Sequence, residues 1–352
     1  MEFMRFADIV GQDLAVGVLI RSKDMGRIPH AYLFTGMKGV GKTTTARAFA
    51  FYLNCEDLQG GDACGMCRSC RRMKSDNFPD FKEISPDKGL IRIDAIREIR
   101  KELQYPPLEA AYRFTVIREG DKMTVEAANA FLKTLEEPPR GNILVVTAAE
   151  PLDLLPTIVS RCQRVPFSPI KSMDIERMLR NKGQGENDGD RSVIAGICRG
   201  SPGRAIRMFQ SGFMEMRRGW LEKLRGVESL DYGEILDMAR QWSDLDKKRL
   251  LDPEEGGTSA MEDILDLWSG IFRDLLVIKT TSDKTGIMNR DAVSALEKLS
   301  TVFTEEALVD ILYILNQAEK DIRRNRNSVL VAQYVLMSIK ERAGQVERRN
   351  YV

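Results

Sequence analysis

The hydrophobic positions in the first 165 residues follow two alternating patterns. Short runs rich in β-branched and aromatic residues, bounded by Gly, Pro or Asp, predict strands, and segments with helical spacing lie between them. The predicted strands are Ala31–Thr35, Phe81–Ser85, Arg113–Arg118, Ile143–Ala148 and Gln163–Phe167. The predicted helices are Thr43–Leu53, Ile93–Gln104 and Val125–Leu135. Strands that alternate with helices indicate a mostly parallel sheet with helices on both faces.

The alternation ends near Pro169, and only helical patterns follow. Two short helices, Ser172–Asn181 and Arg191–Cys198, flank a polar, Gly-rich stretch and predict a small helical domain. Four or five amphipathic helices are expected after that, the clearest being Ala260–Ile278, Glu305–Asp321 and Ser328–Ala343. We therefore predict three domains, at residues 1–167, 168–210 and 211–352.

Composition narrows the class of protein. The 352 residues are 43% hydrophobic and 30% charged, as in ordinary folded proteins. The formal charge of +1 argues against a wholly basic nucleic-acid binder, although local basic runs such as 68–74 and 323–326 are either solvated faces or contacts with DNA or protein. No run approaches the roughly 20 apolar residues of a membrane span, and the start lacks a signal-peptide core. We expect a cytoplasmic protein without membrane contact.

A glycine-rich segment directly follows the strand Ala31–Thr35. It reads Gly36-Met37-Lys38-Gly39-Val40-Gly41-Lys42-Thr43-Thr44, which is the G-x-x-x-x-G-K-T phosphate loop between a strand and a helix. Its glycines let backbone N–H groups turn toward phosphates, helped by the positive end of the following helix. Lys42 would reach the β- and γ-phosphates and Thr43 would hold Mg²⁺. The alternative is a glycine-rich turn without ATP or ADP.

Four of the six cysteines lie within sixteen residues. Cys55, Cys64, Cys67 and Cys70 have the spacing C-x8-C-x2-C-x2-C. Four thiolates at such spacing can surround one tetrahedral ion and leave no position for water, which predicts structural Zn²⁺ in a module at residues 55–70. Redox-active thiols and unliganded cysteines are the alternatives. Cys162 and Cys198 stand apart and are expected to be small buried side chains.

These motifs and several others resemble one family. The others are Asn129-Ala130-Phe131-Leu132-Lys133-Thr134-Leu135-Glu136-Glu137-Pro138-Pro139, Phe6-Ala7-Asp8-Ile9-Val10-Gly11-Gln12, Pro29-His30-Ala31-Tyr32-Leu33-Phe34 and Ser160-Arg161-Cys162. Together they resemble the AAA+ subunits of the bacterial DNA polymerase III clamp loader, over most of the first 210 residues. The helical end matches more loosely, chiefly at Arg324-Asn325-Arg326-Asn327-Ser328.

The resemblance implies an α/β P-loop AAA+ domain with a zinc module, a small helical lid and an all-α C-terminal collar. It implies a role in a pentamer that uses ATP to load a ring-shaped sliding clamp on primed DNA. The expected partners are gamma/tau and delta subunits, with primed DNA met through the assembled complex. Two subunit types are candidates: the delta-prime type, often not a working ATPase, and the gamma/tau type, which hydrolyses ATP.

Departures from the gamma-type pattern favour the delta-prime type. The acidic motif at the end of the third predicted strand reads Val116-Ile117-Arg118-Glu119. Arg118 stands where the family has an Asp that orders Mg²⁺, so a cation would repel the metal. Glu119 keeps the place of the carboxylate that polarises the attacking water, as a vestigial or weak catalytic acid. Weak or absent ATP hydrolysis is therefore expected, unless Glu119 or the nearby Asp121 holds Mg²⁺.

The lid and the chain length point the same way. In Gly200-Ser201-Pro202-Gly203-Arg204-Ala205, a glycine occupies the place of the gamma-type arginine that senses phosphate. Arg204 follows one residue later, about 100° around a helix, and an ordinary helix cap fits this turn equally well. The chain also ends at Val352, without the extension of the tau form, although a short gamma form matches that length.

Arg161 and Thr147 complete the expected site. The resemblance implies that Arg161 is an arginine finger, which stabilises charge on the nucleotide of the next subunit. A surface salt bridge is the alternative. Thr147, at the end of the strand Ile143–Ala148, takes the place of the family's sensor of bound nucleotide, or is simply a strand-end hydroxyl. A repair or recombination helicase loader is a third class, but it would not need residues 132–139.

Overall fold

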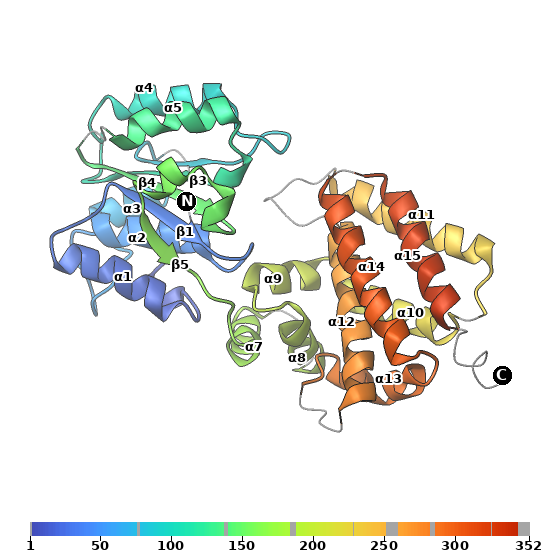
Figure 1. The fold of residues 1–352 in the computed structure, drawn as a ribbon. Coiled ribbons are helices and arrows are strands. Elements are labelled where there is room, and N and C mark those ends of the chain that lie inside the picture. Colours follow the sequence, from blue (N-terminus) through green and yellow to red (C-terminus); the bar gives the residue numbers. More distant parts are fainter. Residues whose placement is uncertain are drawn as a thin grey trace. The chain divides into compact units, whose positions relative to one another are not determined.

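The computed structural model describes residues 2–75, 78–136, 140–183, 188–227, 229–250, 260–281, 286–324 and 326–343. The chain divides into two compact units (Figure 1). The first comprises Met1–Lys182 with Cys198–Ile206, and the second comprises Gly183–Ile197 with Arg207–Val352. The predicted boundary near residue 167 separates no units here, and the stretch 168–210 contributes to both. The three-domain division therefore stays a prediction.

The first unit is built on a parallel sheet of five strands. They are β1 (Ala31–Thr35), β2 (Phe81–Ile84), β3 (Arg113–Ile117), β4 (Asn142–Ala148) and β5 (Gln163–Pro166). Their order in the sheet is β2-β3-β4-β1-β5, and all four pairings are parallel. Each strand matches the sequence prediction to within one residue at either end. The central strands β1, β3 and β4 are buried throughout, which explains their continuous apolar runs.

Helices cover both faces of this sheet, as predicted (Figure 1). The longer helices of the unit are α1 (Asp13–Asp24), α2 (Lys42–Asn54), α4 (Ile93–Leu103), α5 (Val125–Glu136) and α7 (Ser172–Asn181). The shorter ones are η1 (Phe6–Asp8), α3 (Arg68–Met73), η2 (Gly120–Lys122), η3 (Pro151–Asp153) and α6 (Pro156–Val159). Helix α9 (Pro202–Gln210) begins in this unit and continues into the second.

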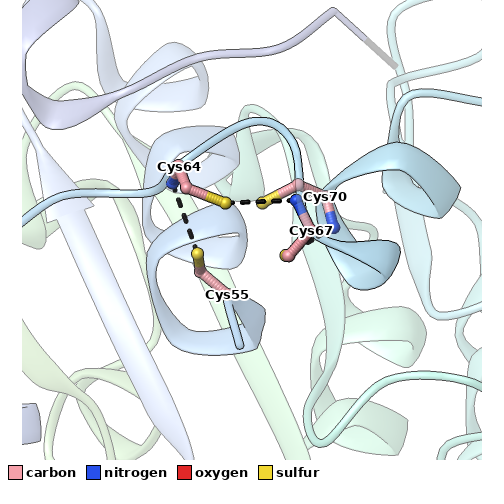
Figure 2. Close-up of side chains that lie close together, drawn as sticks. All are labelled: Cys55, Cys64, Cys67 and Cys70. Carbon is pink, nitrogen blue, oxygen red and sulfur yellow. Dashed lines mark hydrogen bonds between the residues drawn. The ribbon is translucent and has the colours of Figure 1, made fainter. Parts of the chain in front are cut away.

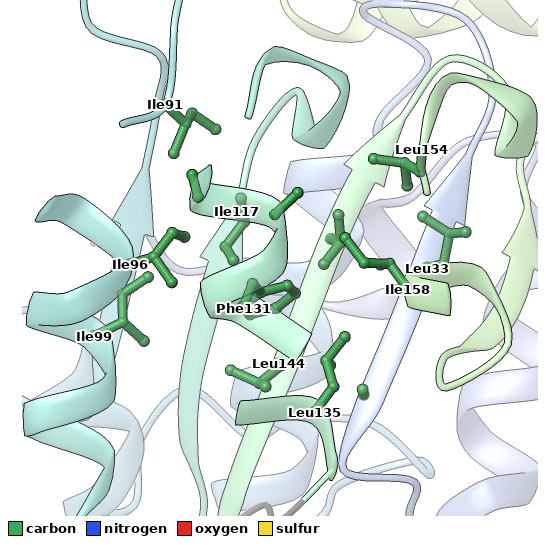
Figure 3. Packing of buried hydrophobic residues seen from close by; sticks show 14 of the residues in the cluster. Leu33, Ile91, Ile96, Ile99, Ile117, Phe131, Leu135, Leu144, Leu154 and Ile158 are labelled. Atoms are coloured by element: carbon green, nitrogen blue, oxygen red, sulfur yellow. The ribbon is translucent and has the colours of Figure 1, made fainter. Parts of the chain in front are cut away.

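The sheet has a separate apolar core on each face. On one face, Ile96 and Ile99 of α4 and Phe131 of α5 pack toward sheet residues such as Ile117 and Leu144 (Figure 3). On the other face, Phe49 of α2 makes edge-on ring contacts with Tyr32 and Phe114. Alternate side chains of one strand point to opposite faces, so a buried strand supplies both cores. The packing fixes the two strand ends that matter most here, those of β1 and β3.

In the described residues of the second unit, all the secondary-structure elements are helices. The unit contains α8 (Asp188–Ile197), α10 (Phe213–Arg225), α11 (Tyr232–Leu250), α12 (Ala260–Thr280), η4 (Arg290–Ala292), α13 (Val293–Ser300), α14 (Glu305–Arg323) and α15 (Ser328–Ala343). Its core includes a chain of ring contacts through Trp220, Trp242, Trp268, Phe272 and Phe303, with centroids 5.1–6.2 Å apart. No described helix is both long and apolar enough to cross a membrane.

Candidate functional site

The phosphate loop joins the carboxyl end of β1 to the first turn of α2. Gly36, Gly39 and Gly41 all have positive φ angles, of 142°, 74° and 107°. At Gly36 a Cβ atom would lie 2.5 Å from the carbonyl oxygen of Phe167, so no side chain fits against this strand end. The positive φ angles turn the backbone back on itself, which brings successive peptide groups to one side of the loop.

The carbonyl groups of the loop are all hydrogen-bonded. The carbonyl oxygens of six consecutive residues, 36–41, accept hydrogen bonds. Within the loop and the first turn of α2, Lys42 Nζ donates to Gly36 and to Met37 (2.9 Å to Met37), and Thr45 N and Oγ1 donate to Gly41 (both 2.9 Å). From elsewhere in the chain, Ser201 Oγ donates to Lys38 (2.9 Å), Gly203 N to Gly39 (2.9 Å) and Gln12 Nε2 to Val40 (3.4 Å). The donors come from three separate parts of the chain. The outer side of the loop is therefore fixed by its surroundings.

The amide groups of the same loop behave differently. Within the described part of the chain, the N–H groups of residues 37–41 donate no hydrogen bond. Unpaired backbone N–H groups are strong donors that favour an anion, and the amino-terminal end of the 13-residue helix α2 adds positive potential. Thr43 and Thr44 are half-buried on the first turn of α2. This polarity, with carbonyls engaged and amides available, fits the phosphates of a nucleotide.

Lys42 is held inside its own loop. Its ammonium group donates to the Gly36 and Met37 carbonyls. Burial lowers the pKa of Lys42 to about 8, although the negative charges of Glu119 and Asp121 act in the opposite direction. An incoming phosphate would replace neutral carbonyl partners with charged oxygen atoms, which are stronger acceptors.

The acidic side of the site lies at the end of β3. Glu119 pairs with Lys38 of the phosphate loop at 3.4 Å, and its backbone N–H donates to Thr147 Oγ1 at 3.1 Å. Glu119 therefore lies beside both the loop and the buried hydroxyl of Thr147 on β4. Its φ of 50° is unusual for a residue other than glycine and redirects the chain immediately after the strand.

Arg118 occupies the position just before Glu119. Its backbone N–H donates to the Ile84 carbonyl at 2.8 Å, which extends the β2–β3 pairing by one residue. Its half-buried side chain makes no hydrogen bond or ion pair with any described residue. Asp121 pairs with Lys122 at 3.5 Å. The site thus combines a phosphate loop with a carboxylate that pairs with Lys38 and an arginine directly before that carboxylate in the chain.

Arg161 makes its contacts away from the phosphate loop. It follows the short helix α6 and donates to Glu136 Oε1 at 2.8 Å and to the Thr157 carbonyl at 3.1 Å. The side chains of Arg161 and Glu136 are 36% and 50% exposed, so this ion pair lies at the surface. Glu136 belongs to the motif Asn129–Pro139, whose last three residues, Glu137-Pro138-Pro139, lie outside the described residues. Arg161 is accessible to a neighbouring molecule and has a partner in its own chain.

The four clustered cysteines converge on one point, although two helices and the intervening loop supply them (Figure 2). All four sulfur atoms lie within 4.8 Å of one another. A tetrahedron of sulfur atoms about 2.3 Å from zinc has edges of about 3.8 Å, so only small shifts separate this cluster from a zinc site. No disulfide forms among the six cysteines of the chain.

Backbone amides support the sulfur atoms as metal ligands. Cys55 Sγ accepts from Cys64 N at 3.3 Å, and Cys64 Sγ accepts from Met66 N and Cys67 N at 3.3 and 3.2 Å. The amides of Met66 and Cys67 lower the pKa of Cys64 to about 7, toward the thiolate that binds metal. Cys67 caps helix α3 by accepting from Cys70 N. The donor set and its geometry fit a structural zinc module.

The sequence analysis missed several residues that shape the site. Lys38 pairs with Glu119, and Glu136 pairs with Arg161. Gln12 bridges Val40 and Ser168, and Ser201 contacts the phosphate loop. All four lie within motifs that the sequence analysis quoted, but their partners are distant in sequence. His30, whose Nε2 lies 3.1 Å from the Leu135 carbonyl, takes no part in the site.

The fold and the loop define the class. A parallel sheet of order β2-β3-β4-β1-β5, with a phosphate loop between β1 and α2 and a helical segment docked on that loop, is a P-loop α/β domain of the AAA+ class. The family model described as "DNA polymerase III, delta subunit" matches residues 11–171. This match and the relatives described next support a subunit of a bacterial DNA polymerase III clamp loader.

Relatives of known function include two subunit types. The chain is 28% identical to the delta-prime subunit of DNA polymerase III from Bacillus subtilis, over 94% of this chain and 96% of that protein. It is 29% identical to the tau subunit of Bacillus subtilis, over 91% of this chain and 58% of that protein. It is also 36% identical to the tau subunit of Escherichia coli, over 49% of this chain and 26% of that protein.

The chain therefore spans little more than half of the Bacillus subtilis tau subunit and about a quarter of the Escherichia coli tau subunit, but nearly all of the delta-prime subunit. Among solved structures, a gamma-subunit-related protein from Thermotoga maritima is similar, with 19% identity over 92% of this chain and 99% of that chain. The TM-score of this pair is 0.47.

Proposed function

We propose that the chain is a delta-prime-type subunit of the clamp loader, which helps to load the sliding clamp on primed DNA during replication. The observation that carries this choice is Arg118, a cation at the end of β3 where Mg²⁺ would need an ordering carboxylate. Glu119 is already paired with Lys38. A carboxylate without its metal-ordering partner gives weak or absent hydrolysis of ATP in this subunit. It acts as a scaffold and not as a motor.

Its contribution to ATP turnover is made in the neighbouring subunit. Arg161 is exposed at the surface and serves as an arginine finger for the nucleotide of a gamma/tau subunit. A guanidinium beside the γ-phosphate stabilises charge that spreads over the phosphoryl oxygens in the transition state. Glu136 holds the side chain in the free subunit, and because a surface ion pair is worth only about 0–1 kcal/mol, a phosphate can displace it.

The subunit binds ATP or ADP, with Mg²⁺ contributing little. The available amides of residues 37–41 and the ammonium group of Lys42 support this assignment, with Gly36, Gly39 and Gly41 shaping the loop and Thr43 and Thr44 beginning the helix behind it. Thr147 links the occupied site to the backbone of Glu119 and serves as the sensor of bound nucleotide. The bound nucleotide has a structural role.

Cys55, Cys64, Cys67 and Cys70 hold one structural Zn²⁺. The ion ties the end of α2 to α3 across a loop that has few apolar residues to bury. With four thiolates around it, the ion has no open position for water and takes no part in catalysis.

The helical end joins the subunit to its neighbours. We assign residues 168–210 to a lid and residues 211–352 to a collar that packs with gamma/tau and delta subunits. Primed DNA is met through the assembled complex, in the cytoplasm. A gamma/tau-type ATPase motor is the second candidate, and the retained Glu119 beside Thr147 and a complete phosphate loop favour it.

An assembled clamp loader tests the finger directly. We expect Arg161→Ala in this chain to lower ATP hydrolysis by the complex by one or more orders of magnitude while the complex still assembles. Arg97→Ala, which removes an exposed arginine outside the site that pairs with Asp94, is the matched control, and it should leave the turnover intact. Undiminished hydrolysis with Arg161→Ala would rule out the finger.

A further inference from the structure

The turn at residues 200–203 is docked on the outer side of the phosphate loop. Ser201 Oγ donates to the Lys38 carbonyl at 2.9 Å, and Gly203 N donates to the Gly39 carbonyl at 2.9 Å. The turn is itself anchored, because the Gly200 carbonyl accepts from Ile170 N at 2.9 Å. Two consecutive carbonyls of the loop are therefore held by one turn at the start of helix α9.

The fit between the two segments depends on glycine. A Cβ atom on Gly39 would lie 2.5 Å from Ser201 Oγ, and one on Gly203 would lie 3.1 Å from both Cα and O of Gly39. Backbone meets backbone here, so any side chain at position 203 would require the turn and the loop to shift apart by a few tenths of an ångström. Arg204, the next residue, is buried.

These contacts determine which way the loop's peptide groups face. In a phosphate-binding loop the N–H groups point to the anion, so the carbonyls of the same peptide units point away from it. Ser201 and Gly203 hydrogen-bond two carbonyls on that outer side, and residues 37–41 keep their N–H groups available. The turn stabilises the loop conformation that receives phosphate, without contact with the phosphate itself.

We propose that Ser201 and Gly203 are positioning residues that preorganise the phosphate loop and couple nucleotide binding to the docking of this turn through main-chain hydrogen bonds. This inference rests on the proposed binding of nucleotide. In this proposal, the main-chain hydrogen bond from Gly203 links the nucleotide site to the lid, which is the role that a phosphate-sensing side chain would otherwise have. Because such coupling is reciprocal, bound nucleotide strengthens the docking of the turn by the same factor that docking strengthens nucleotide binding.

Affinity for ADP tests the first half of the proposal. Loss of one neutral hydrogen bond weakens an equilibrium by roughly 2- to 10-fold, and we expect this increase in the ADP dissociation constant for Ser201→Ala, which removes the hydroxyl donor. Gly203→Ala keeps its backbone N–H, but its Cβ atom would lie 3.1 Å from Gly39 and force the turn away from the loop, so the hydrogen bond to the Gly39 carbonyl should weaken and the dissociation constant should rise in the same direction. Gly219→Ala is the matched control, because a Cβ atom there would meet nothing within 4 Å and Gly219 lies in the other unit. Alanine favours helix over glycine, so Gly203→Ala should not reduce affinity by unfolding α9.

Amide hydrogen exchange tests the second half of the proposal, that bound ADP strengthens the docking of the turn. If Ser201 and Gly203 had a merely structural role, substituting them would not change the effect of ADP on exchange. In the wild type and in Gly219→Ala, ADP should slow amide exchange in residues 198–206 by a similar factor. In Ser201→Ala and Gly203→Ala this ADP-dependent slowing should shrink, even where the melting temperature is unchanged.

The outcomes separate this inference from the proposed function. Wild-type protein that binds ADP, with binding lost in Lys42→Ala but equal to the wild type in Ser201→Ala and Gly203→Ala, would overturn the coupling and leave the nucleotide site standing. Wild-type protein that binds no ADP would overturn both. Weaker binding in both turn variants, with reduced ADP-dependent protection, supports the inference.

Discussion

The Arg161 guanidinium donates to the Glu136 carboxylate across 2.8 Å, within one subunit and at its surface. A finger that acts on a neighbouring nucleotide must exchange this carboxylate for phosphate. The exchange is inexpensive, since exposed ion pairs contribute about 0–1 kcal/mol. The pair keeps a long, flexible side chain near one place without locking it there.

We therefore expect Glu136→Gln to leave ATP hydrolysis by the assembled complex unchanged or to raise it by at most a few-fold. The substitution removes the charge that competes with phosphate for Arg161. Glu98→Gln, which removes a surface carboxylate paired with Lys82, is the control. A fall to the level of Arg161→Ala would mean that Glu136 instead holds the finger in its active position.

Nucleotide binding should depend on pH through Lys42. The pKa of Lys42 in the free protein is lowered to about 8 by burial. Phosphate oxygens favour the charged form, so the complex binds more protons than the free protein above that pH. Affinity for ADP should fall as the pH rises above 8, by at most about tenfold per pH unit.

Titration calorimetry in buffers of different ionisation enthalpy would detect the accompanying proton uptake. Lys42→Arg is the control, because arginine stays charged throughout this range and should remove most of the pH dependence even if it binds less tightly. An ADP affinity that is constant to pH 9.5 in the wild type would contradict the assignment of Lys42.

Arg118 should decide how far nucleotide binding depends on Mg²⁺. With a cation in place of the ordering carboxylate, chelation of Mg²⁺ should change the ATP affinity of the wild type by less than about threefold, under 1 kcal/mol. Arg118→Asp supplies the missing acid and should make binding clearly Mg²⁺-dependent. Arg118→Gln removes the positive charge without adding an acid and separates these effects. Strong Mg²⁺ dependence in the wild type would show that Glu119 or Asp121 already holds the ion.

The cysteine cluster predicts about one zinc ion per chain in purified protein. Serine in place of Cys64 or Cys67 should abolish stoichiometric zinc. It should also make residues 55–70 sensitive to proteolysis, because without the ion no ligand bonds hold the cysteine side chains together. Cys162→Ser, outside the cluster, should keep its zinc. A fully folded preparation free of zinc would refute the site.

Much of the first unit could be predicted from sequence because its signals are local. The runs from Ala31 and Ile143 are buried on both faces, so nearly every residue is apolar, and their bounds follow directly. The phosphate loop and the cysteine spacing are likewise short segments whose chemistry restricts them. Helix α1 was missed, since neither a capping side chain nor a strong apolar stripe marks Asp13–Asp24.

The pairings within the site could not be predicted in the same way. Lys38 with Glu119, and Gly39 with Gly203, join segments that only the folded sheet and the docked turn bring together. The sequence placed Arg118 and Glu119 at a strand end, but it could not reveal that Glu119 forms an ion pair with Lys38. From the sequence, Gly203 indicated only the absence of a phosphate-sensing arginine. In the structure, its backbone N–H donates to the Gly39 carbonyl.

We propose that this subunit assists a neighbour's ATP turnover without hydrolysing ATP itself. Steady-state ATP hydrolysis by the purified chain, measured with and without primed DNA, distinguishes this role from that of a motor subunit. We predict a rate that DNA does not raise and that does not differ from the rate of Lys42→Ala. DNA-stimulated turnover that collapses in Lys42→Ala would contradict the claim and identify the chain as a motor subunit.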